Sequence, residues 1–321
     1  SRGIDSDAGG FATVSFQTVT PPQREDLGTV RLSEDELPLD DAFSFVISPG
    51  QSLSVLIIEH PNAPAGESLY LERALGIGSD PPHRIDRRRS TQLNPSHLEG
   101  RDVVILNDAP FPRGAAGSRL REFVLNGGGL FVSLGQQSTA NVWPRDFADL
   151  LPGTIGAVVD RLGDRGATVS VTDFDHPLLE LFSTPRSGDF SRTRFYRYRR
   201  LVEADASGLD VLARFDDGEV ALAEARAGEG RVIVWTSGLA NSWNVFPLQP
   251  VFLPFLHQLT KHLAGYAPGR TWYAAGEVVD LRAYPHLMAY GRRSATARIQ
   301  DEDRELVVEL PSGARSVRST D

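Results

Sequence analysis

The chain has 321 residues, of which 40% are hydrophobic and 23% are charged, and its formal net charge at pH 7 is -9. This length favours two or three structural units over one, and no stretch approaches the roughly 18 consecutive apolar residues of a membrane span. The negative charge argues against binding to duplex nucleic acid. The absence of cysteine excludes disulfides, thiolate nucleophiles and cysteine-ligated zinc.

Residues 1–50 are predicted to form a β segment. Apolar residues alternate with polar ones there, which is typical of half-buried strands. About three strands in a segment of this length cannot bury a core alone, so the segment is expected to be either the end of a β-sandwich (immunoglobulin-like) module or an edge that docks on another unit. The expected strands are residues 11–19, 28–32 and 42–47.

A different architecture is predicted for residues 51–266. Short, fully apolar runs alternate with helical stretches, and this alternation predicts a doubly wound α/β sheet whose strands are mostly parallel. The expected strands are residues 54–59, 83–89, 102–106, 130–134, 167–171, 194–201, 209–215, 220–225 and 231–236. The expected helices or helical turns are residues 67–75, 95–98, 119–125, 147–151, 175–182 and 250–263. Residues 267–321 are predicted to begin a second β module.

The stretch RLREFVLNGGGLFVSLGQQ, residues 119–137, organises this part of the chain. It predicts an amphipathic helix, a turn at Asn126 and Gly127 to Gly129, and a buried strand, because Gly and Asn tolerate the left-handed conformation that ends a helix. Polar residues follow the carboxyl end of the strand, where open α/β sheets bind their ligands.

Three segments carry a resemblance to a known family. They read SVLIIE, LREFVLNGGGLFVSLG and ALAEARAGEGRVIVWTSGLANSWNVFPLQPVFLPFLHQLTKHLAG. Over roughly residues 28–265 the chain resembles the class I glutamine amidotransferase-like domain of aerotolerance-type (BatA-like) bacterial membrane proteins. The resemblance implies a flavodoxin-like fold flanked by small immunoglobulin-like β segments. It also implies an extracytoplasmic (periplasmic) domain of a membrane-anchored protein, with protein partners in a membrane-associated complex.

The residues that match the family's catalytic elbow have lost its chemistry. An active amidotransferase has the pattern G-x-C-x-G-x-Q and a later His-x-Glu, whereas this chain has Ser133 in place of the cysteine and Phe131 in place of the first glycine. His97 and Glu99 form the His-x-Glu of this chain, but they precede the elbow. Serine needs a strong base beside it to act as a nucleophile. We therefore expect a non-catalytic interaction or sensing module.

The crevice at the elbow is nevertheless expected to bind a small ligand or a partner. No cofactor and no metal are expected. The degenerate elbow consists of Ser133, Gly135 and Gln136, and the candidate ligand-binding residues are Gln136, Gln137, Asn107, Asp108, Asn241 and Trp243.

Two other functions remain open from the sequence. One is a hydrolase or amidase in which His257 or His176 activates Ser133. The other is a carbohydrate-binding module that uses the arginines and tyrosines of residues 192–200, although a solvated edge strand explains the same residues.

Two further clusters are interpreted structurally. Asp173, Asp175 and His176 could ligate a divalent metal, but a capped helix start explains them as well. An apolar cluster is expected to pack under the sheet, and it consists of Trp243, Phe246, Leu248, Phe252 and Phe255.

Overall fold

The structure is a computed structural model of the chain. It describes residues 26–31, 42–47, 52–78, 81–139, 150, 153–183, 190–202, 208–266, 278–280, 295–301, 304–310 and 316–318. The chain divides into two compact units, of which one spans Gln51–Ala267 and the other combines Ser1–Gly50 with Pro268–Asp321. The further division of the flanks into two separate β modules stays a prediction.

The described residues of the flanking unit form antiparallel strand pairs. β1 (Asp26–Arg31) pairs with β2 (Ala42–Ile47), β13 (Val278–Asp280) with β16 (Ser316–Arg318), and β14 (Ala295–Asp301) with β15 (Arg304–Leu310). The strands expected at residues 28–32, 42–47 and in the C-terminal segment are thereby confirmed. The strand expected at residues 11–19 lies outside the described residues, and the immunoglobulin-like character of these flanks stays a prediction.

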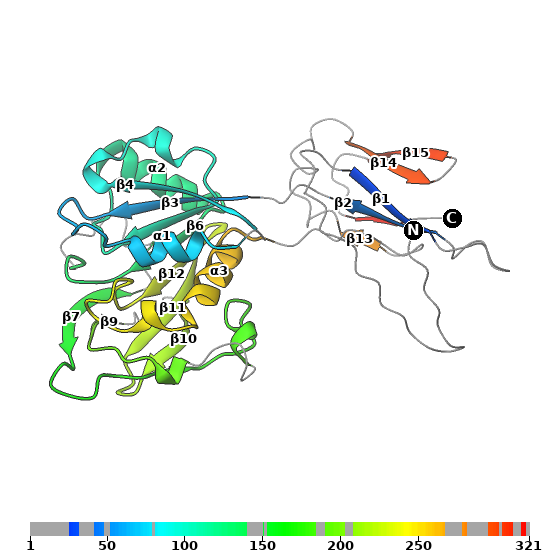
Figure 1. Cartoon of the computed structure of the whole chain (residues 1–321). Helices are drawn as coiled ribbons and strands as arrows, with labels where there is room; N and C mark the ends of the chain where they lie inside the picture. The colour runs from blue at the N-terminus through cyan, green and yellow to red at the C-terminus, as the bar shows by residue number, and fades with distance from the viewer. Residues whose placement is uncertain are drawn as a thin grey trace, which may run out of the picture. The chain divides into compact units, whose positions relative to one another are not determined.

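The larger unit is built on an eight-stranded sheet, seen in Figure 1 with its helices. Its strand order is β4-β3-β5-β6-β12-β11-β10-β8, in which the first five strands are parallel and the last three continue the sheet antiparallel. In that order the strands are His83–Arg89, Leu53–Glu59, Val103–Asn107, Gly129–Ser133, Gly230–Trp235, Val220–Ala227, Asp210–Phe215 and Val169–Val171. The predicted mixed α/β unit with a mostly parallel sheet is confirmed.

Helices cover both faces of this sheet. α1 (Leu69–Leu75) and α3 (Phe252–Leu263) pack on one face, and α2 (Gly114–Leu125) packs on the other. Neighbouring residues of β6 alternate between the two cores, as expected for a strand buried on both faces. The short 3-10 turns are Ser90–Gln92, Pro95–Leu98, Glu180–Ser183, Phe190–Arg192 and Phe246–Leu248. The helix expected at residues 147–151 lies mostly outside the described residues.

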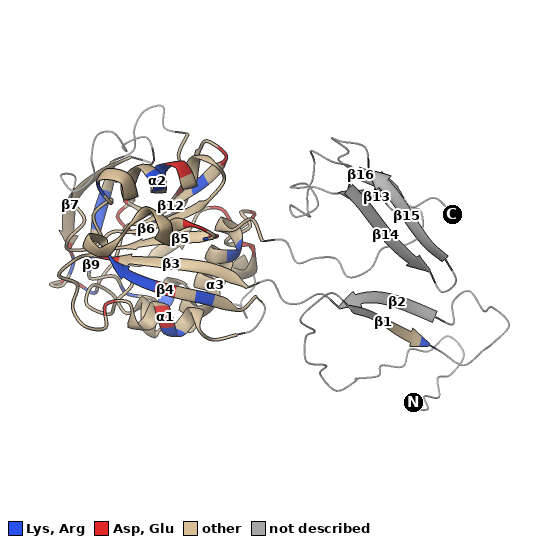
Figure 2. Ribbon diagram, turned by 90° about the horizontal axis from the view of Figure 1, so that it is seen from above, with Lys and Arg blue, Asp and Glu red and all other residues tan. Residues whose placement is uncertain are grey.

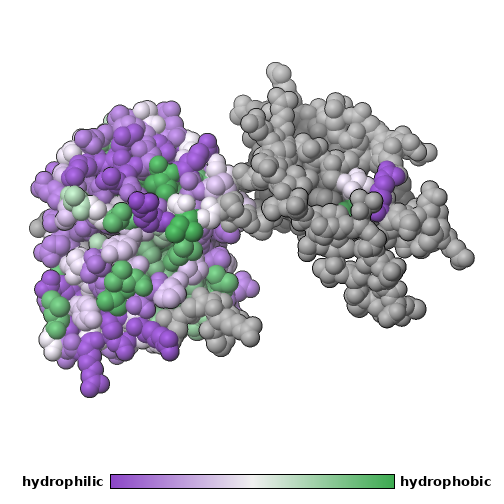
Figure 3. Space-filling model, in the orientation of Figure 1, coloured by the Kyte–Doolittle hydropathy of each residue, from purple (hydrophilic) through white to green (hydrophobic). Residues whose placement is uncertain are grey.

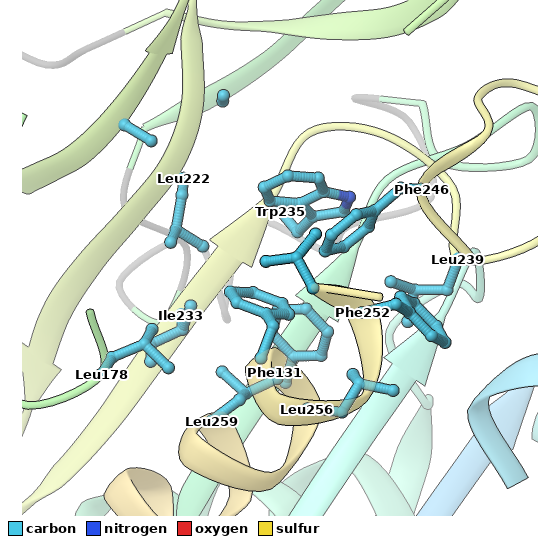
Figure 4. Close-up of a cluster of buried hydrophobic side chains, with 14 of the residues drawn as sticks. Phe131, Leu178, Leu222, Ile233, Trp235, Leu239, Phe246, Phe252, Leu256 and Leu259 are labelled. Atoms are coloured by element: carbon cyan, nitrogen blue, oxygen red, sulfur yellow. The ribbon is translucent and has the colours of Figure 1, made fainter. Parts of the chain in front are cut away.

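Aromatic residues fill the core under α3. Figure 4 shows Phe131, Trp235 and Phe246 beside side chains of α3, and all three are fully buried. The expected apolar cluster is therefore core, with one correction. Leu248 is 56% exposed, because it ends a short 3-10 turn rather than lying on the helix. Leu69, the first residue of α1, is also exposed, at 46%.

Three consecutive glycines lead from the end of α2 into β6, and they are required for two reasons. Gly127 has a φ of +106°, which confirms the predicted glycine turn after the helix. A Cβ on Gly128 would lie 2.4 Å from the Phe123 ring, and one on Gly129 would lie 2.5 Å from the carbonyl oxygen of Leu263. The first glycine allows the turn, and the other two allow close packing of β6 against α2 and α3.

Charged residues cover the edge and surface of this unit. β4 is one of the two edge strands, and Figure 2 shows basic residues along it. Charge on an edge strand opposes pairing with a second chain. On the face seen in Figure 3, apolar residues lie in small groups among polar ones.

A separate antiparallel pair, β7 (Thr154–Asp160) and β9 (Arg197–Val202), was not foreseen as a pair. The solvated edge strand expected at residues 192–200 is wrong in part. Phe195 and Tyr198 are fully buried and Arg199 is 6% exposed. Because these side chains point into the protein, Tyr198 and Arg199 are not available to the carbohydrate-binding surface that the sequence left open as an alternative.

Candidate functional site

The carboxyl ends of the parallel strands meet at one edge of the sheet. Strand register places Glu59, Asn107, Ser133 and Trp235 in one row across β3, β5, β6 and β12. Loops that follow these strands surround a cavity of about 260 Å³. It is lined by His60, Asn62, Ala63, Pro64, Glu67, Asn107, Asp108, Gly135, Gln136, Gln137, Arg197, Gly238, Ser242 and Trp243. The cavity lies at the carboxyl ends of the strands, the region in which the sequence predicted a ligand site.

The Ser133 hydroxyl is buried in a chain of hydrogen bonds. Ser133 Oγ donates to Asn107 Oδ1 over 2.9 Å, and Asn107 Nδ2 donates to Ser68 Oγ over 3.0 Å. All three residues are at most 2% exposed. An amide oxygen accepts this proton without activating the hydroxyl, because an amide is not a base near neutral pH.

The two histidines considered as bases for Ser133 are engaged elsewhere. His257 Nε2 lies 2.9 Å from the carbonyl oxygen of Ala74, and His176 Nε2 lies 2.9 Å from Glu224 Oε2. Among the described residues, the hydrogen-bond partner of the Ser133 hydroxyl is Asn107. The arrangement is therefore not that of a serine nucleophile with its base.

Asp108 binds, through its carboxylate, the backbone of the residues that directly follow the elbow. Its carboxylate accepts hydrogen bonds from Gln137 N at 3.0 Å, Ser138 N at 2.9 Å and Ser138 Oγ at 2.8 Å. Its φ of +45° makes it the non-glycine residue with positive φ in the described part of the chain, and aspartate tolerates this region better than most residues. Burial raises the pKa of Asp108, while the hydrogen bonds from Gln137 and Ser138 act in the opposite direction.

Arg199 holds the same elbow from the other side. Its Nε donates to the carbonyl oxygen of Gly135 at 2.7 Å, its Nη2 to that of Gln136 at 3.1 Å, and its Nη1 to that of Gly156 at 3.2 Å. Burial lowers the pKa of Arg199, and the charge of Asp108 opposes this. Asp108 thus accepts hydrogen bonds from the N–H groups of Gln137 and Ser138, which directly follow the elbow. Arg199 donates to the carbonyl oxygens of Gly135 and Gln136 within it. This leaves the exposed Gln136 beside the cavity.

Glu67 is a residue of the site that the sequence analysis missed. It lines the cavity, and it has no hydrogen-bond or ion-pair partner for its carboxylate among the described residues. Burial raises its pKa, and the nearby Asp108 and Glu59 raise it further. Glu59 itself is 3.0 Å from Arg87. The one sequence signal is position, since Glu67 follows the loop after the first buried strand.

Glu67→Gln is expected to make the protein more stable at pH 7. The pKa of Glu67 is raised in the native state above its ordinary value of 4.5. Below pH 4.5 the carboxyl group is protonated in the folded and unfolded states and does not destabilise the fold. The free energy of unfolding then decreases as the pH rises through the native-state pKa of Glu67. Urea unfolding at pH 4 and pH 7 measures the effect. The two proteins should differ at pH 7 and converge at pH 4, and a difference that is equal at both values would contradict this assignment. Exposed Glu180→Gln is the matched control.

The other expected ligand-binding residues divide into two groups. Asn107, Asp108, Gln136, Gln137 and Trp243 line the cavity. Asn241 is exposed and is not among the lining residues.

His176 lies in a cluster different from the one weighed in the sequence. Asp173 accepts a hydrogen bond from the backbone N of Asp175 and only shapes the turn. His176 and His262 instead flank Glu224, with their Nε2 atoms 2.9 Å and 2.8 Å from Glu224 Oε2. Burial by itself would raise the pKa of Glu224, but the two histidines lower it to about 2. Sequence reasoning missed this cluster because its members come from three distant segments.

No protein-family model and no curated protein matches this sequence. Solved structures do match. Two are the cytoplasmic proteins STM3548 and STM1381 of Salmonella typhimurium, each 16% identical, with a TM-score of 0.53 over 66% of this chain and 99% of theirs. Another is a ThuA-like protein from Parabacteroides merdae, 15% identical, with a TM-score of 0.45 over 71% of this chain and 94% of its own. At such low identity the two Salmonella structures show the fold alone.

The comparison also corrects the expected location. Both Salmonella proteins are described as cytoplasmic, which contradicts the extracytoplasmic location that the family resemblance implied. Within the described part of the chain, no helix has the length and apolar character needed to cross a membrane.

Proposed function

We propose that the Gln51–Ala267 unit is a non-catalytic module that binds a small polar molecule in the crevice at the carboxyl ends of its parallel strands. One observation carries this proposal. The Ser133 hydroxyl is buried and donates to Asn107, so the elbow is built as a fixed wall rather than as a nucleophile. Asp108 and Arg199 hold that wall rigid, and a preformed wall is what a binding site needs.

We also propose that the unit is a flavodoxin-like, amidotransferase-type domain. Its parallel strands, numbered in chain order, lie in the order 2-1-3-4-5, which is the flavodoxin-like arrangement. The elbow follows the fourth of these strands. We propose as well that this unit is part of a BatA-like protein and that it has protein partners in a membrane-associated complex. Both proposals depend on the three sequence segments that carry the resemblance.

The cavity lining indicates the chemistry of the ligand. The exposed amide groups of Gln136 and Gln137 can both donate and accept hydrogen bonds, the Glu67 carboxylate accepts them, and Trp243 supplies an apolar surface. The positive charge in the lining, that of Arg197, is already paired with Asp160. The volume of about 260 Å³ is near the lower end of the range for small-molecule sites. A neutral, polar ligand of a few heavy atoms to about the size of one ring fits this lining best.

A fragment screen tests the proposal. Neutral polar fragments are added to the ¹⁵N-labelled full chain, and binders should shift the side-chain amide signals of Gln136 and Gln137 and the indole signal of Trp243. The double variant Gln136→Ala with Gln137→Ala should weaken binding about tenfold, equivalent to ~1.4 kcal/mol. Gln92→Ala is the control, because Gln92 is exposed outside the cavity lining. Fragments that bind only at other surfaces, or equally to all variants, would refute the proposed site.

A further inference from the structure

A second constellation of chemically active side chains lies away from the cavity. His176 comes from the segment between β8 and the turn Glu180–Ser183, Glu224 from β11, and His262 from α3. None of the three is among the residues that line the cavity. Strand register places Glu224 beside Ile233, two residues before the carboxyl end of β12. The cluster therefore needs an explanation separate from the proposed ligand site.

The three side chains converge on one point. The Nε2 atoms of His176 and His262 lie 2.9 Å and 2.8 Å from the same oxygen, Glu224 Oε2. The imidazole centroids are 4.8 Å apart with an interplanar angle of 64°, so the rings do not stack but face the carboxylate from two sides. The side chains are 9% to 11% exposed. The potential ligand atoms all lie within 4.8 Å of one another.

We propose that His176, Glu224 and His262 form a binding site for one divalent zinc-type cation. Two histidines and one glutamate are a ligand set that zinc accepts, with water in the fourth position. Tetrahedral ligands at the usual zinc bond lengths are about 3.3 Å apart. To admit the ion, the contacts of 2.8 Å and 2.9 Å need to open by about half an ångström, and the ligand atoms that are up to 4.8 Å apart need to approach one another by about 1.5 Å.

Cation binding must move the proton of His176 from one ring nitrogen to the other. The backbone N–H of Leu178 donates to His176 Nδ1 over 3.2 Å, so in the metal-free protein the proton of His176 is on Nε2, where it faces Glu224. Zinc takes the Nε2 lone pair, and the proton then belongs on Nδ1. Binding therefore breaks the contact with Leu178 and moves a proton across the ring, which an NMR experiment can observe directly.

One neighbouring charge opposes the cation. Arg231 Nε lies 3.8 Å from Glu224 Oε1, and Arg231 Nη1 donates to the carbonyl oxygen of His262 at 2.8 Å. The guanidinium lies near Oε1, beyond hydrogen-bond distance, and it leaves Oε2 for the ion. Its positive charge weakens cation binding, whereas its hydrogen bond fixes the end of α3 that carries His262.

Zinc titration of the full chain tests the site. Binding of ZnCl₂, measured by calorimetry and by competition with a chromogenic chelator, should give one equivalent in the native protein. His262→Gln and Glu224→Gln should each weaken it at least tenfold. His257→Gln is the matched control, because His257 lies on the same helix and bonds to Ala74, and it should bind zinc as the native protein does. Equal binding by all four proteins, or none by the native protein, would overturn the proposal.

A second measurement needs no variant. Long-range ¹H–¹⁵N spectra of the native chain should report the Nε2–H form of His176 without zinc and the Nδ1–H form with one equivalent. A purely structural cluster would keep the Nε2–H form at every zinc concentration, and that outcome would also refute the site.

Discussion

Replacing Arg199 with alanine is expected to lower the free energy of unfolding by about 3 kcal/mol. The guanidinium donates to three backbone carbonyls, those of Gly135, Gln136 and Gly156. Arg199 is only 6% exposed, so water cannot fully replace these bonds. The variant would leave buried carbonyls without donors. It would also remove the positive charge that stabilises the ionised, buried carboxylate of Asp108. Urea unfolding, followed by tryptophan fluorescence, measures the loss.

Arg200→Ala is the matched control for this experiment. Arg200 is the next residue on β9, and its ion pair with Glu219 is solvent-exposed on the arginine side. Exposed ion pairs contribute between about 0 and 1 kcal/mol, so this variant should unfold almost as the native protein does. Arg199→Lys should recover little, because one ammonium group cannot reproduce the planar fork that reaches three carbonyls. Equal losses for the two alanine variants would show that Arg199 does not anchor the elbow.

Gly135→Ala is expected to destabilise the protein by about 2 kcal/mol through overpacking. A Cβ at this position would lie 2.6 Å from Asp108 Cγ and Oδ2. The carboxylate cannot move away without losing its hydrogen bonds to Gln137 N and Ser138 N. The added methyl group should therefore loosen the elbow as well as destabilise the unit.

Hydrogen exchange distinguishes this local effect from general destabilisation. The amides of Gln137 and Ser138 should exchange faster in Gly135→Ala by more than the change in global stability explains. Gly163→Ala is the control, because a Cβ there meets nothing within 4 Å. Its stability should remain within about 0.5 kcal/mol of the native value. Unchanged protection of Gln137 and Ser138 in Gly135→Ala would contradict the role assigned to Asp108.

Local patterns were sufficient to predict the central sheet. A run such as residues 103–106 is apolar at every position, which is typical of a strand covered on both faces. The glycine turn after α2 was predictable for a similar reason, because positive φ at Gly127 is a requirement of the local backbone. The position of the crevice followed from these two, since strand ends and loops determine it.

Contacts between distant segments were not predictable in this way. Arg199 lies in a stretch rich in arginine and tyrosine that is typical of a solvated edge, yet it is bound to Gly135, 64 residues earlier in the chain. Nothing within the stretch indicates that β9 packs against the elbow. Glu67 was missed because its raised pKa depends first on burial and then on the charge of Asp108, and both are set by the packing of distant segments.

The histidine cluster shows the same limit. His176 was first grouped with Asp173 and Asp175, its neighbours in sequence, whereas its partners are Glu224 and His262. The closeness of Asp173, Asp175 and His176 in sequence suggested a metal-binding motif. The fold instead places the carboxylate of Glu224 against the His176 imidazole.

We propose that the elbow retains the geometry of a site without a reactive nucleophile. Incubation of the full chain with a fluorophosphonate, followed by intact-mass analysis, tests it most directly, because this reagent modifies serines that a neighbouring base activates. We predict that the reagent adds no mass to the native chain. The Ser133→Ala variant should likewise show no adduct and should differ from the native chain only by the mass of the substitution. An adduct that maps to Ser133 and is lost in Ser133→Ala would contradict the claim and establish a working hydrolase site.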